Sequence, residues 1–115
     1  MKTVMNQAAQ GDMLLRRVDS LPEGAKPIAS EQGMFVLAHS ETGHNHCVLE
    51  RPGVQFFSGM ELLKSFLVVP EGEEVEVFHL RDEHTHESLK LPAGTWEITR
   101  QREYDVTEGW RLAAD

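Results

Sequence analysis

Two histidine pairs form the clearest chemical pattern in this sequence of 115 residues. One residue separates His44 from His46, and one separates His84 from His86. On an extended strand, side chains two residues apart point to the same face, so each pair can present two imidazoles to one ion. Glu50 shares the parity of the first pair. Two histidines with one carboxylate suit a divalent transition metal (Zn, Fe, Mn or Ni) and leave coordination positions for water or substrate.

The spacing of these histidines leaves two interpretations open. One is a pair of surface or hydrogen-bonded imidazoles, which is the common reason for such spacing in a single strand. The other is a metal site, which requires the two pairs to converge in space. We expect a histidine-lined pocket that holds a divalent metal, in either an enzyme or a small-molecule binder.

A polar cluster near the C-terminus suggests a different chemistry. Arg100, Arg102 and Tyr104 could hold and orient a phosphate, with histidine as general base and acid. This alternative is a metal-free phosphodiesterase or ribonuclease. The same residues also suit an edge strand whose charges face water.

The elements that must position these residues are short and extended. Apolar or alternating runs separated by Gly, Pro and polar turn residues occur at 13–18, 34–38, 44–50, 54–57, 62–69, 74–80, 88–91 and 95–100. This spacing predicts an all-β domain of about eight short strands, a barrel or a sandwich. Residues 1–10 are predicted to be a polar lead-in, and residues 11–115 a single domain.

The remaining composition limits the partners and the compartment. The formal net charge of −8 disfavours nucleic acid, and no apolar run reaches the ~20 residues that span a bilayer. The single cysteine, Cys47, cannot form an internal disulfide, which fits a reducing, cytoplasmic location. Its strand parity is opposite to that of the first histidine pair, so we interpret it as a small core residue. We expect Val75, Val77, Trp96 and Ile98 in the core as well.

The segment from His44 to Glu50 resembles the first motif of the cupins, two histidines one residue apart followed by a glutamate. Residues 92–97 resemble the second motif, with Glu97 where that motif has histidine. The glycine that normally precedes the first motif is absent, and Gln101 replaces the usual asparagine of the second. The resemblance implies a small β-barrel or jelly roll with a metal on the two histidines, Glu50 and Glu97. His86 or His84 could supply the fourth ligand instead.

Most of the chain is also similar to small uncharacterised proteins of bacterial and phage genomes. The similarity is carried by residues 10–12, the TGHNH run at 42–46, residues 86–94 and the QREY run at 101–104. It adds a third class of function, a non-enzymatic accessory or inhibitor protein. A small-molecule ligand and a homodimer both remain open, and no membrane partner is expected.

Overall fold

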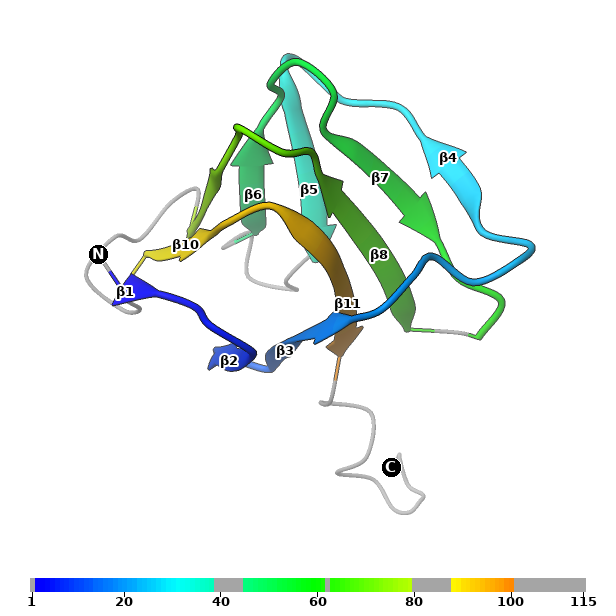
Figure 1. Ribbon diagram of the computed structural model, residues 1–115, viewed down its shortest axis with the longest axis horizontal. Helices are drawn as coiled ribbons and strands as arrows, with labels where there is room; N and C mark the ends of the chain where they lie inside the picture. Colours follow the sequence, from blue (N-terminus) through cyan, green and yellow to red (C-terminus); the bar gives the residue numbers. More distant parts are fainter. Residues whose placement is uncertain (1, 39–44, 62, 80–87, 101–115) are drawn as a thin grey trace.

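The computed structural model describes residues 2–38, 45–61, 63–79 and 88–100, and these residues form eleven β-strands and no helix. The strands lie in two sheets that face each other as a sandwich (Figure 1). The five-stranded sheet has the order β1 (Lys2–Thr3), β10 (Leu89–Leu91), β9 (Val75–His79), β6 (His46–Leu49) and β5 (Met34–Ala38). The six-stranded sheet has the order β2 (Gln7–Gln10), β3 (Met13–Val18), β11 (Gly94–Arg100), β8 (Lys64–Val69), β7 (Gln55–Ser58) and β4 (Lys26–Ile28). The all-β prediction is confirmed, and of its two forms the sandwich is the one observed.

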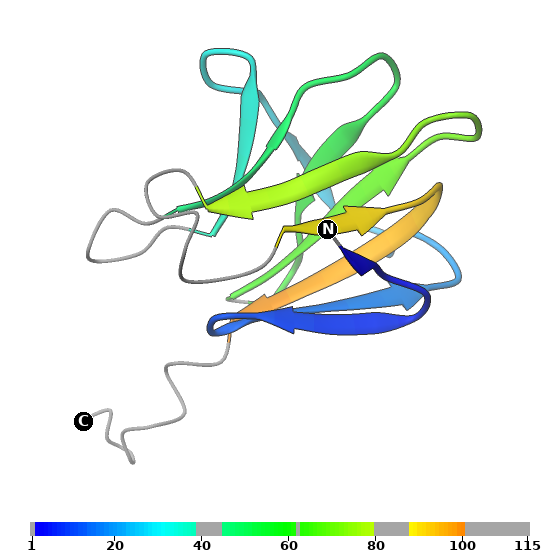
Figure 2. The same ribbon diagram turned by 90° about the vertical axis from the view of Figure 1, so that its left-hand side faces the viewer.

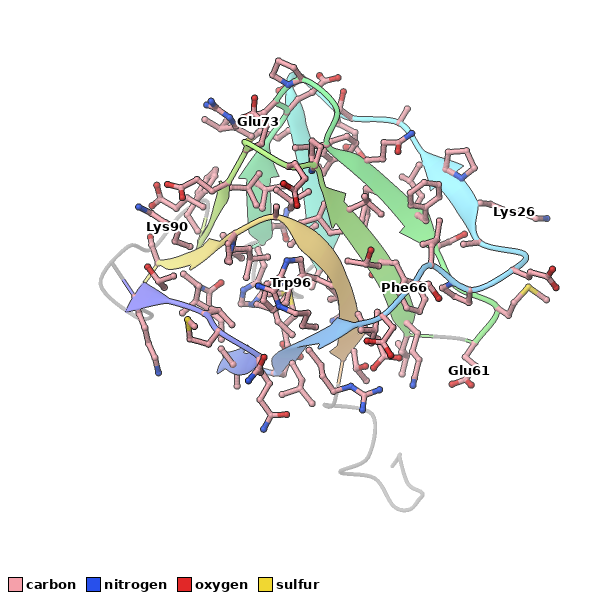
Figure 3. The ribbon with its side chains drawn as sticks, viewed as in Figure 1. Lys26, Glu61, Phe66, Glu73, Lys90 and Trp96 are labelled. Carbon is pink, nitrogen blue, oxygen red and sulfur yellow. The ribbon has the colours of Figure 1, made fainter. Side chains whose placement is uncertain are left out.

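The alternation of side chains across the strands builds the core between the two sheets. In the pairing of β3 with β11, Leu15 lies opposite Ile98, and both are fully buried. Trp96 is fully buried, and its side chain is labelled near the centre of the view in Figure 3. The buried positions include the four predicted core residues, Val75, Val77, Trp96 and Ile98. Period-two patterning therefore identified the faces that pack together.

The N-terminal residues differ from the expected polar lead-in. Residues 2–3 form β1, which pairs in parallel with β10, and residues 7–10 form β2, which pairs with β3. Val4, between the two strands, is 1% exposed. These strands are held by backbone pairing at the sheet edges, and their side chains carry too little alternation to reveal them in the sequence.

A second strand absent from the sequence prediction is β4. Its three exposed residues, Lys26–Ile28, pair with β7 at the free edge of the six-stranded sheet. Pro27 at its centre is compatible with this position, because proline is tolerated in an edge strand, where its missing N–H faces outward. The strand forms one wall of the cleft described below.

One end of the sandwich is closed by Trp96 and its neighbours, and we call it the tryptophan end. The indole Nε1 of Trp96 donates a hydrogen bond to the carbonyl oxygen of Pro92 at 3.1 Å. The guanidinium of Arg17 lies 4.7 Å from the centre of the Trp96 ring and donates to the carbonyl oxygens of Met5 and Ala93. Gly94 has a φ of +149°, and a Cβ atom there would lie 2.6 Å from Arg17 Nη1, so a side chain at this position would displace the guanidinium.

Candidate functional site

Several strand ends meet at the opposite end of the sandwich. Each histidine of the chain lies at or close to one of these strand ends in the sequence. The last residue of β5, Ala38, pairs with His46 at the start of β6, and His46 pairs with His79 at the end of β9. These ends, with the β2–β3 turn and the end of β11, lie on the left of Figure 2. We call this the histidine end, and define it by Gln10, Ala38, His46, His79 and Arg100.

The other four histidines lie in two segments that separate these strands in the sequence. Between β5 and β6, residues 39–44 contain His39 and His44. Between β9 and β10, residues 80–87 contain His84 and His86. Both segments lie outside the described residues. The topology brings together the described strand ends that adjoin the two histidine pairs in the sequence, since β5, β6, β9 and β10 are neighbours in one sheet.

His46 is the predicted ligand whose environment the structure defines most completely. Its side chain is on the inner face of β6 and only 4% exposed, and its Nδ1 lies 2.6 Å from Oε1 of Gln10. Gln10 is 3% exposed, and its Nε2 donates to the carbonyl oxygen of Val77 at 3.3 Å. The contact therefore joins the two sheets across the interior, because Gln10 belongs to β2 and His46 to β6.

This small network assigns the proton on the imidazole. A carbonyl oxygen can only accept, so the amide nitrogen of Gln10 faces Val77 and its oxygen faces His46. The ring then donates from Nδ1, and in the neutral imidazole Nε2 is the nitrogen that carries the lone pair. Metal-binding histidines have the same arrangement, in which the second ring nitrogen donates to a neighbouring acceptor.

Glu50 is not brought to His46. Strand β6 ends at Leu49, and the exposed carboxylate of Glu50 accepts a hydrogen bond from Ser30 Oγ at 2.8 Å. Four residues of extended chain separate the two side chains by about 13 Å, too far to share one ion. The parity argument assumed a strand that continues to Glu50, whereas β6 ends one residue earlier.

Glu97 is directed away from the interior. It lies between the buried residues Trp96 and Ile98 on β11, so its side chain is on the outer face of the six-stranded sheet. There it forms ion pairs with Arg16 at 2.9 Å and Lys64 at 3.3 Å. Residues 92–97, which were compared with the second cupin motif, include the first part of β11, and Glu97 belongs to a surface ion-pair cluster.

The remaining predicted site residues divide into two groups. His44, His86, Arg102 and Tyr104 lie outside the described residues, while Arg100 lies within them. In the described ranges no three His, Cys, Asp or Glu side chains come together as a metal-binding group. The described part of the histidine end therefore contributes one oriented imidazole and one arginine.

Arg100 occupies the last inner-face position of β11. It lies opposite Met13 in the pairing with β3, and Met13 in turn lies opposite Gln10. The guanidinium nitrogens Nε and Nη2 are buried and have no hydrogen-bond partner, and the carboxylate of Asp12 is 4.0 Å from Nη2. The sequence pointed to Arg100 and gave no role to Gln10 or Asp12, although residues 10–12 were part of a noted similarity.

Cys47 is separate from this polar region. It is fully buried, as predicted, and alternation places its side chain on the face opposite to His46. Burial, with a smaller effect of the Glu31 charge, raises the pKa of the Cys47 thiol to about 11. The thiol is protonated at neutral pH, which makes it a poor nucleophile.

Two clefts differ in their charged lining. One, of about 220 Å³ on the outer face of the five-stranded sheet, is lined partly by Arg51 and Lys90, which are paired with Glu73 and Glu74 at 2.9 and 3.0 Å. The other, of about 330 Å³, is lined by Arg100 and by residues of β4, β5, β7 and β8. Only the second combines an apolar wall with a cation that makes no hydrogen bond through its buried nitrogens.

Taken together, these features define a class of protein: an all-β sandwich with one structurally closed end and one end bearing histidine and arginine. Residues 9–101 match a family described as a domain of unknown function (DUF8820), so the chain belongs to that family. No curated protein and no solved structure matches the chain. Among the described residues there is also no helix long and apolar enough to cross a membrane.

Proposed function

We propose that the histidine end binds a divalent transition metal, with Nε2 of His46 as one ligand. The observation that carries the proposal is the contact between Gln10 Oε1 and His46 Nδ1, because it fixes the ring and makes Nε2 the nitrogen with the lone pair in the neutral imidazole. Fixing a ligand through its second nitrogen raises its basicity and its affinity for metal.

The ligand set proposed here is rich in nitrogen. Glu50 and Glu97 are engaged elsewhere, so the further ligands come from histidines next to the same strand ends, of which His44 and His86 are the sequence candidates. Imidazole ligands favour zinc, nickel, copper or iron over manganese. When bound, such a metal supplies Lewis-acid polarisation or an activated water.

Metal titration of protein purified without an affinity tag tests the proposal. After removal of adventitious metal with a chelator, isothermal titration with Zn²⁺ and with Ni²⁺ should reveal about one tight site per chain. Elemental analysis after dialysis should agree with that stoichiometry. Retention of less than about a tenth of an equivalent of each metal would overturn the proposal.

Three variants locate the site within the fold. His46→Gln should abolish the tight site, and Gln10→Leu should weaken it roughly 10–100-fold by releasing the ring. Glu97→Gln is the matched control, since its carboxylate faces the outer surface, and it should bind like the wild type. Circular dichroism checks that each variant folds. A folded His46→Gln variant with unchanged affinity would contradict the assignment.

A further inference from the structure

Arg100 is unusual among the described arginines because its charge is buried without the acceptors that such a charge requires. It continues the inner-face row of Trp96 and Ile98, and its side chain is 18% exposed. Nε and Nη2 are inaccessible and make no hydrogen bond, and Asp12 is at ion-pair distance only. Burying donors of a charged group without acceptors is costly, so a structural role alone does not account for this arrangement.

The two nitrogens without partners are chemically matched to a particular kind of acceptor. Nε and Nη2 form one edge of the planar guanidinium, and their N–H bonds run parallel. A carboxylate can accept both bonds with its two oxygens, which is the strongest and most specific pairing that arginine makes. Asp12 does not fill this role, since its nearest oxygen is 4.0 Å from Nη2.

The cleft that Arg100 lines is largely apolar elsewhere. Its volume of about 330 Å³ lies at the lower end of the range for small-molecule sites. Ile28, on the edge strand β4, lines one side of the cleft and is 36% exposed. Apolar surface is therefore accessible in the absence of ligand. The apolar lining consists of Ile28, Val36, Leu37, Phe56 and Leu63.

The other charged residues of the cleft restrict the charge of a ligand. Lys64 also lines it, but its ammonium group pairs with Glu97 and Glu61. Glu31 lines the cleft with an exposed side chain, and its negative charge disfavours a ligand with two negative charges more than one with a single charge. The lining therefore favours one carboxylate on an apolar body over phosphate or a dicarboxylate.

We propose that this cleft binds a small apolar monocarboxylate, a medium-chain or aromatic acid. Its carboxylate pairs with Arg100 after the side chain rotates and turns its buried Nε–Nη2 edge into the cleft, while its body covers the apolar wall. The site requires no metal and is independent of the function proposed for His46. It gives the chain a second ligand, chemically distinct from a transition metal, at the same end of the sandwich.

Calorimetric titration in buffer containing excess chelator tests the inference, with octanoate as the probe. 1-Octanol presents the same chain without the charge, and inorganic phosphate presents the charge without the chain. Octanoate should bind at least about tenfold more tightly than either. Equal binding of octanol would remove the role of the arginine, and equal binding of phosphate would remove the assigned ligand class. No detectable octanoate binding would overturn the inference as a whole.

Two variants and a control connect the binding to the cleft. Arg100→Met keeps the length of the side chain and removes the charge, so octanoate should lose its advantage over octanol. Ile28→Glu adds a negative charge at an exposed edge position, where folding should be unaffected, and should also abolish octanoate binding. Arg51→Met, in the cleft on the outer face, should bind octanoate like the wild type. Unchanged octanoate affinity in folded Arg100→Met or Ile28→Glu protein would refute the site.

Discussion

The two ends of the sandwich hold an arginine each, on the same inner face of the β3–β11 pair, in opposite states. At the tryptophan end, Arg17 donates two hydrogen bonds to main-chain carbonyls and lies over the Trp96 ring. At the histidine end, Arg100 has two buried nitrogens without a hydrogen bond. A satisfied arginine closes the sandwich, and an unsatisfied one is prepared for an acceptor that is not part of the described structure.

The difference teaches that burial of a charged residue is not by itself evidence of a structural role. Both arginines are within one ladder and follow from the same period-two pattern, with Arg17 opposite Trp96 and Arg100 opposite Met13. The two arginines differ in whether their hydrogen-bond donors have acceptors. The following predictions test that separation, beginning with the largest expected effect.

Trp96→Ala should produce the largest loss of stability, because it removes the fully buried indole that fills the tryptophan end. The expected decrease in the free energy of unfolding is about 3–5 kcal/mol, measured by urea denaturation. Phe57→Ala is a control with a half-buried aromatic side chain and should lose clearly less. Equal losses in the two variants would mean that Trp96 contributes no more to the stability of the core than a half-buried aromatic side chain does.

Cys47 lies on the face of β6 opposite to His46, and the pH dependence of stability tests whether its thiol is shielded from water. Folding raises the pKa of the thiol from its ordinary 9.0 to about 11, so the folded state favours the protonated form. The thiol's contribution to stability is complete below pH 9 and is lost as the pH rises to about 11. Relative to Cys47→Ala, the wild type should lose about 2 kcal/mol between pH 8 and 11 in urea denaturation. A constant difference would show that the thiol is not shielded.

Arg17→Met and Arg100→Met compare the two ends directly. The first leaves the carbonyl oxygens of Met5 and Ala93 without their donor and should decrease the free energy of unfolding by about 1–2 kcal/mol. The second removes buried donors that have no acceptor and should leave stability unchanged or raise it. Urea denaturation without ligand measures both, and a greater loss from Arg100→Met would reverse the interpretation of the two ends.

Much of the fold followed from the sequence because inner faces carry a strong pattern. The runs at 13–18 and 34–38 became β3 and β5 with the predicted bounds, and the core positions on β9 and β11 were correct. Strands β1, β2 and β4 were missed because edge strands depend on backbone pairing, which imposes little pattern on side chains.

The candidate site was less predictable, because it depends on distance and on pairing between distant strands. Sequence parity placed His46 on an inner face and gave no indication that Gln10, 36 residues earlier, would orient it. The motif resemblance grouped Glu50 and Glu97 with the histidines, and the structure puts them beyond the end of β6 and on an outer face. Short motifs define local geometry, whereas partners across the interior require the fold.

Glu97→Gln should have the smallest effect, and it separates motif resemblance from position in the fold. The Glu97 carboxylate pairs with Arg16, whose side chain is 54% exposed, and with the partly exposed Lys64. Solvent screening limits such pairs to about 0.2–1 kcal/mol, so urea denaturation should detect only a slight destabilisation. Zinc and nickel affinities should stay at wild-type values, because the side chain and His46 are on opposite sides of the six-stranded sheet. A large loss of metal affinity would restore Glu97 as a ligand. The Glu97 side chain would then have to move from the outer to the inner face of the sheet when metal binds.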